Sequence, residues 1–154
     1  MSSESQVPLV SHHLTGIIST KSNKFMPDHF SIKRRHPRIF FSSNDQINAI
    51  ISSTENPQAS FSGSVLNLSQ GGLQLSQKRS EYRGLQAEDT LIIRRIPGFN
   101  ELIPLADIPA KIVWLMNNQH LNHVIMGIAF TILTGNQVQT LKSFVNTWLA
   151  LHQE

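Results

Sequence analysis

Residues 59–76 have the sequence ASFSGSVLNLSQGGLQLS, and this stretch decides the fold class. Small and apolar residues occupy every second position from Ala59 to Val65, and serines occupy the positions between them. A period of two with one polar face is typical of a half-buried β-strand. Asn67 to Gly72 is rich in turn-forming residues, and apolar and polar residues alternate again from Leu73 to Ser76. The stretch therefore predicts two strands joined by a turn.

The rest of the chain continues the same pattern on both sides. The other predicted strands are Ile39 to Phe41 continuing through Ile47 to Ser52, Thr90 to Ile96, Ile108 to Leu115, and Val124 to Leu133. About six short strands separated by turns predict an all-β-dominated fold, namely a small antiparallel barrel. Closure of the sheet would remove most unpaired strand edges.

The C-terminal segment changes to a helical period. One helical face collects apolar residues, with Phe144 at its border: Val138, Leu141, Val145, Trp148 and Leu149. Thr134 and Gln137 have the spacing of a capping box. We expect an amphipathic helix from Gly135 to about His152 that plugs or flanks the sheet. Trp114 and Trp148 are both expected in the core.

Length, charge and composition exclude several classes of protein. The chain has 154 residues, no cysteine, and a net charge of +3 from 13 basic and 10 acidic residues. Residues 1–30 are predicted to form a flexible tail, and residues 31–154 a single domain. The absence of cysteine excludes disulfides and thiolate chemistry. No segment approaches the roughly 20 apolar residues of a membrane span, and no export signal is visible, so we expect a soluble, cytoplasmic protein.

The densest group of charges runs from Lys33 to Arg38, with the sequence KRRHPR. Pro37 disfavours a helix and pushes His36 toward an extended conformation. In an extended chain Arg34 and Arg38 face the same side, roughly 13 Å apart at about 3.3 Å per residue. Two guanidinium groups so placed suit a ligand with two phosphates, and each could also bind or stack on a guanine. A solvated basic junction is the simpler interpretation of this segment alone.

The turn Asn67-Leu68-Ser69-Gln70-Gly71-Gly72 is the second candidate. Asn67 offers an amide, Ser69 offers a hydroxyl, and the two glycines allow positive φ and close backbone approach. Taken alone, the same residues also suit an ordinary hairpin turn.

Together the two motifs resemble the PilZ domain family. That family carries Arg-x-x-x-Arg followed by Asp/Asn-x-Ser-x-x-Gly, here Arg34 to Arg38 and Asn67 to Gly72. The segments AKIVW (residues 110–114) and GIAF (residues 127–130) are similar to the family's last two strands. The resemblance covers about residues 30 to 150, and it implies a six-stranded antiparallel β-barrel with a C-terminal helix.

The resemblance also implies binding of the bacterial second messenger cyclic di-GMP. In the family, the two arginines bind phosphates and guanines, and the turn contacts the other guanine and the ribose. The implied ligand-binding residues are Arg34, Arg38, Asn67, Ser69 and Gly72, and Lys33, Arg35 and Gly71 are additional candidates beside them. Lys33 stands where a long basic side chain accompanies a stacked ligand dimer in the family, which favours two ligands per chain over one.

The expected function is a cyclic di-GMP receptor and adaptor that regulates an unidentified effector protein. Two alternatives stay open: a PilZ-like interaction module that binds no nucleotide, and a small-barrel binder of single-stranded nucleic acid. The latter should show aromatic residues among basic ones on an outer sheet face. No catalytic cofactor, metal site or catalytic residue is expected, and the pairs His12/His13 and His120/His123 lack a matching set of ligands.

Overall fold

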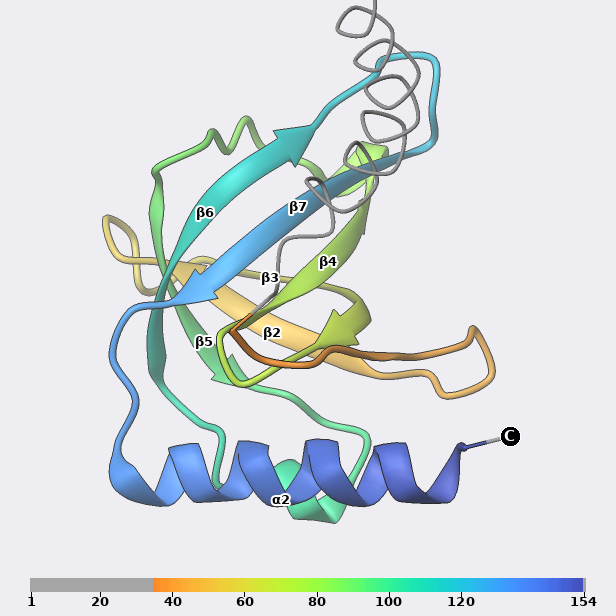
Figure 1. Ribbon diagram of the computed structural model, residues 1–154. Coiled ribbons are helices and arrows are strands. Elements are labelled where there is room, and N and C mark those ends of the chain that lie inside the picture. The colour runs from red at the N-terminus through yellow and green to blue at the C-terminus, as the bar shows by residue number, and fades with distance from the viewer. Residues whose placement is uncertain (1–34, 154) are drawn as a thin grey trace, which may run out of the picture. The chain divides into compact units, whose positions relative to one another are not determined.

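The computed structural model describes residues 35–153, and Figure 1 shows the arrangement of its elements. Lys33, Arg34 and the predicted tail of residues 1–30 lie outside these described residues. The elements within residues 35–153 are the strands β1 (Ile39–Phe40), β2 (Asn48–Ser53), β3 (Ser60–Leu68), β4 (Gly72–Lys78), β5 (Thr90–Arg95), β6 (Ile108–Met116) and β7 (His123–Phe130), the short 3₁₀ helices η2 (Arg79–Glu81) and η3 (Asn100–Leu102), and the helix α2 (Gly135–Leu151). None of the helices in this part of the chain has the length and apolar character needed to cross a bilayer.

Six of the strands close into an antiparallel barrel. They follow one another in the order β3, β2, β5, β6, β7 and β4, and β4 pairs back onto β3. The two-residue strand β1 is an addition beside the end of β3, where Ile39 pairs with Leu68 and Phe40 with Asn67. The predicted six-stranded barrel with a C-terminal helix is therefore confirmed.

The barrel interior contains most of the apolar residues that the alternation predicted, although Ala59 is exposed. Leu73 and Leu75 are 3% and 0% exposed, and Val65 faces the same core. Ser60, Ser62 and Ser64 are exposed on the other face of β3. The hydrophobic core thus lies inside the barrel, and the polar side chains of β3 point to its outer face.

Trp114 does not lie in the core, contrary to prediction. The pairing of β6 with β7 shifts between Ile112 and Trp114, as at a β-bulge. A bulge interrupts the period of two, so Trp114 does not point inward although it stands two residues after buried Ile112. Its indole covers Gly127 on the outer face, where an added Cβ would lie 2.1 Å from the indole nitrogen Nε1.

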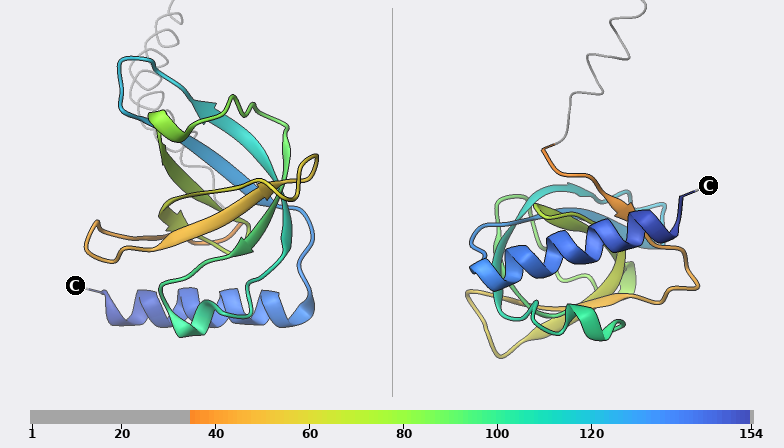
Figure 2. Two further views of the ribbon diagram at one scale, coloured as in Figure 1. Left: turned by 180° about the vertical axis from the view of Figure 1, so that it is seen from behind. Right: turned by 60° about the horizontal axis from the view of Figure 1, so that its bottom comes forward.

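The helix α2 lies across one end of the barrel, as the two views in Figure 2 show. Its capping box is confirmed, with Gln137 N donating to Thr134 Oγ1 at 3.1 Å and Thr134 N donating to Gln137 Oε1 at 3.0 Å. Leu141, Phe144 and Val145 form the buried face. Val138 and Leu149 are 40% and 36% exposed, so placing them on the buried face was wrong.

Packing against an aromatic cluster decides which side of α2 is buried, and that side is not centred on the apolar face predicted from the sequence. Trp148 packs edge-on against Phe41 and Phe99, with ring centroids 5.0 and 5.6 Å apart. Phe144 lies against Phe99 and Trp148. Packing against these rings buries the side of the helix that carries Phe144, and it leaves Val138 and Leu149 at the exposed edge.

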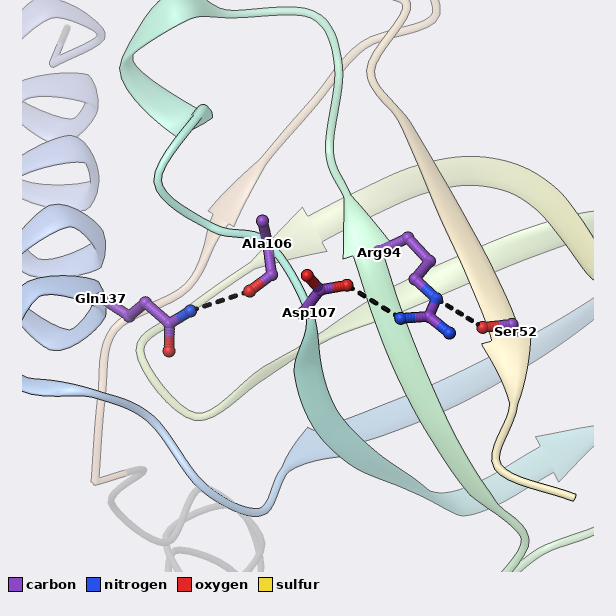
Figure 3. A network of polar contacts seen from close by, with 5 residues as sticks. All are labelled: Ser52, Arg94, Ala106, Asp107 and Gln137. Atoms are coloured by element: carbon purple, nitrogen blue, oxygen red, sulfur yellow. Dashed lines mark hydrogen bonds and ion pairs between the residues drawn. The ribbon is translucent and has the colours of Figure 1, made fainter. Parts of the chain in front are cut away.

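A polar network joins the start of α2 to the barrel (Figure 3). Gln137 Nε2 donates to Ala106 O at 3.0 Å. Asp107, the residue after Ala106, forms an ion pair with Arg94 at 2.9 Å. Arg94 Nε in turn donates to buried Ser52 Oγ at 2.8 Å. The loop that contains Ala106 and Asp107 therefore connects the N-terminus of α2 to β5 and β2.

Candidate functional site

The turn between β3 and β4 is shorter than predicted. Asn67 and Leu68 belong to β3, Gly72 begins β4, and only Ser69 to Gly71 lie between the strands. Asn67 is paired on both sides, with Phe40 of β1 and with Gln74 of β4. It is 3% exposed, so three strands hold its backbone in place.

Ser69 shapes this turn with both its backbone and its side chain. Ser69 N donates to Gly72 O at 2.9 Å. The Ser69 hydroxyl accepts from Gly71 N at 3.1 Å and lies 3.5 Å from Gly72 O. A serine hydroxyl that accepts a hydrogen bond from the backbone N–H two residues later commonly stabilises a tight turn.

The close approach of the β7 backbone requires a glycine at position 72. Gly72 pairs with Ala129 of β7, and an added Cβ would lie 2.0 Å from Ile128 O. Positive φ, the other freedom expected of the two glycines, is used by neither Gly71 nor Gly72. At Gly71 an added Cβ would lie 3.5 Å from the His36 ring and 3.8 Å from Ser69 Oγ, which are ordinary contacts.

The end of the basic segment leads into β1, which runs antiparallel to the end of β3 just before this turn. Ile39 pairs with Leu68 and Phe40 with Asn67, so the same register continued backward places Arg38 opposite Ser69 and His36 opposite Gly71. The position of the His36 ring beside Gly71 agrees with this register. Arg38 is half-buried and Arg35 is exposed.

The structure thus brings together Arg38, Asn67, Ser69, Gly71 and Gly72, which the sequence places about 30 residues apart. The predicted roles of Arg34 and Lys33 stay predictions, since both residues lie outside residues 35–153. The assembled part combines the half-buried guanidinium of Arg38, the buried amide of Asn67 and the exposed backbone of Gly71. Such a surface suits an anionic, planar ligand.

Two further residues beside the motifs were not identified from the sequence. His36 lies inside the arginine motif and contacts the turn at Gly71. Phe40 lies opposite Asn67 and is 64% exposed. Strand alternation could have identified Phe40, because it places Arg38 and Phe40 on the side away from buried Ile39.

No cluster of three or more histidine and acidic residues with the geometry of a metal site occurs within residues 35–153. His120 and His123 are both exposed. The pair His12/His13 lies outside the described residues.

The fold and the paired motifs define a small β-barrel domain that carries a basic segment beside a glycine turn. The family model for the PilZ domain matches residues 32–147. The chain therefore belongs to the PilZ domain family, and the resemblance is confirmed.

Several solved structures have the same fold. The PilZ domain of YcgR from Escherichia coli with c-di-GMP is 12% identical, with a TM-score of 0.60 over 77% of this chain and 93% of that chain. The Bacillus subtilis inhibitor of motility MotI/DgrA is 15% identical, with a TM-score of 0.59 over 79% of this chain and 53% of that chain.

The MrkH–c-di-GMP complex of K. pneumonia is 10% identical, with a TM-score of 0.59 over 77% of this chain and 53% of that chain. This chain thus spans about half the length of MotI/DgrA and of MrkH. No curated protein matches it. At these identities the structural likeness establishes the fold alone.

Proposed function

We propose that this protein is a receptor for cyclic di-GMP that acts as an adaptor without catalytic activity. The pairing of β1 with β3 supports this most directly, because its register, continued by one residue, would bring Arg38 opposite Ser69 in a chain that carries both motifs. The fold is also that of PilZ domains solved with c-di-GMP. We place its action in the cytoplasm, on an effector protein that would bind the receptor differently with and without ligand.

Isothermal titration of the full chain with cyclic di-GMP tests the proposal. We expect saturable binding that an equal concentration of GMP does not reproduce, since one GMP lacks the second phosphate and guanine. Lys33 favours an end point of two ligands per chain, and Lys33→Leu should then reduce the end point. An end point of one would contradict the ligand dimer but not the receptor function. No binding of cyclic di-GMP would leave the protein as an interaction module.

A nucleic-acid binder remains the second candidate because of one observation. Phe40 and Trp114 are aromatic residues exposed on the strands, and Lys111 is three residues from Trp114. Salt dependence separates the two functions. A protein that binds single-stranded nucleic acid contacts many phosphates, so its affinity falls steeply as the salt concentration rises. Cyclic di-GMP offers only two phosphates, so its binding should depend less on salt. Anisotropy titrations with oligo(dT) between low and physiological salt would measure that slope.

A further inference from the structure

A groove runs along one side of α2, apart from the nucleotide motifs. It has a volume of about 740 Å³. One wall is α2, and the other is formed by the η3 segment and the turn after β1. Its apolar floor consists of Phe99, Phe144, Trp148 and Leu151. Residues 36–40 and 67–72 do not line the groove.

The floor of the groove is a packed group of aromatic rings, and its far end is open. Phe99, Phe144 and Trp148 pack against one another with ring centroids 5.4 to 5.9 Å apart. His152 stacks on Trp148 at 4.2 Å, and Leu151 is 74% exposed. A preformed apolar surface with an exposed anchor at one end is typical of an interaction site.

The rim of the groove is acidic although the whole chain is basic. Its lining contains the carboxylates of Asp45 and Glu101 and no lysine or arginine. Asp45 Oδ2 accepts from Ser42 N at 2.6 Å and from Ser42 Oγ at 3.1 Å, which holds this carboxylate in place. The two ion pairs recorded within residues 35–153, Arg94–Asp107 and Lys111–Glu88, involve neither carboxylate.

The length of the groove indicates an elongated ligand. Its lining residues along α2 and its C-cap extend from Gln139 to His152, which is 13 residue steps. At a helical rise of about 1.5 Å per residue, they span about 20 Å. A helical peptide of about 14 residues has the same length, and its apolar face would cover the aromatic floor.

We propose that this groove binds an amphipathic helix of a partner protein, with apolar residues facing Phe99 and Trp148 and lysine or arginine facing Asp45 and Glu101. Burial of the apolar face supplies the affinity. The acidic rim selects basic over acidic partners. The proposal is independent of nucleotide binding, because the groove uses none of the motif residues.

A pair of peptides tests the charge preference. Each is a fluorescent helix of about 14 residues with leucines at i, i+3, i+4 and i+7 spacing, one with lysines and the other with glutamates at the remaining positions. Anisotropy titration with the full chain should show saturable binding of the lysine peptide. The glutamate peptide should bind about tenfold more weakly or worse. Equal affinities, or no binding of the lysine peptide, would overturn the proposal.

Variants of the protein locate the site. Leu151→Arg should weaken binding of the lysine peptide about tenfold or more, because it removes an exposed anchor and adds a like charge. Leu149→Arg is the matched control on the other side of α2 and should bind as the unaltered chain does. Glu101→Lys should weaken the lysine peptide and strengthen the glutamate peptide. Equal effects of Leu149→Arg and Leu151→Arg would place binding elsewhere and overturn the proposal.

Sedimentation velocity identifies the remaining alternative, a second copy of this chain. We expect no association that depends on the groove. A concentration-dependent dimer that Leu151→Arg disperses and Leu149→Arg preserves would make the second copy the occupant and overturn the proposal. Circular dichroism spectra of each variant confirm that both exposed positions tolerate arginine.

Discussion

At the scale of single residues, the two neighbouring glycines of the turn have different reasons for being glycine. Gly72 faces the Ile128 carbonyl at a distance that leaves no room for a side chain. Gly71 faces the His36 ring across an ordinary contact distance. Neither needs positive φ, so packing alone distinguishes them.

Gly72→Ala should therefore lower the free energy of unfolding by about 2 kcal/mol or more, because β4 and β7 must separate to admit the methyl group. Gly71→Ala is the control and should change it by no more than about 0.5 kcal/mol. Urea unfolding followed by tryptophan fluorescence measures both. Equal losses would show that the turn, and not the contact with β7, requires glycine.

The arginines offer a second comparison at this scale. Arg38→Ala should weaken cyclic di-GMP binding by about 2 kcal/mol, or roughly 30-fold, because it removes a charge-assisted contact beside Ser69. Arg34→Ala should have a similar effect if the segment is extended. Arg35→Ala should cost less, since an extended segment would place it on the other side. Calorimetry on the three variants tests this, and equal losses at all three positions would contradict the extended conformation.

At the scale of elements, α2 depends on its first turn for two separate attachments. Thr134 and Gln137 cap the helix reciprocally, and Gln137 also donates to Ala106 O in the loop that Arg94 anchors through Asp107. The Gln137 side chain thus caps the start of the helix and also connects the helix to the barrel, and Figure 3 shows this second contact.

Loss of the cap alone should cost less than loss of both attachments. Thr134→Ala should lower the free energy of unfolding by about 1 kcal/mol. Gln137→Ala should lower it by about 2 kcal/mol, because the Ala106 carbonyl also loses its partner. Gln139→Ala on the exposed side is the control, with an expected change within about 0.5 kcal/mol. A larger loss from Thr134→Ala than from Gln137→Ala would show that the bond to Ala106 contributes nothing.

At the scale of the whole molecule, the basic segment connects the two candidate surfaces. Arg38 lies beside the turn, and Phe41, three residues later, packs on Trp148 in the floor of the groove. β1 between them contains only two residues. A ligand held between Arg38 and the turn would therefore stabilise a short strand that has little pairing of its own.

Hydrogen exchange can detect that stabilisation. Cyclic di-GMP should slow amide exchange in residues 35–41 and 69–72, and it should change α2 little because the helix is already packed. Arg38→Ala at the same ligand concentration is the control and should show less protection. If residues 35–41 exchange as slowly without ligand as with it, the segment is pre-formed and binding is signalled by another change.

The sequence by itself determined most of the strands, the helix and the two motifs, because each depends on neighbours along the chain. It was wrong to continue the strand at Ile39 through Ser52, since β1 and β2 are separate strands that pair with different parts of β3. Alternation marks Val65, Leu73 and Leu75 as core residues wherever the strands pair. The capping box forms within one turn of helix. The same alternation failed at Trp114, because the bulge in β6 arises from pairing with β7, about a dozen residues away.

Only the tertiary structure decided which motif residues meet and which side of α2 is buried. The pairing of β1 with β3 brings the arginine segment to the glycine turn, and that pairing is long-range in the sequence. On α2 the apolar stripe is wider than the face that the aromatic cluster covers, so packing against Phe41 and Phe99 selected Phe144 and exposed Val138 and Leu149. Periodicity defines an apolar face along one element, but how far that face is covered depends on the elements that pack against it.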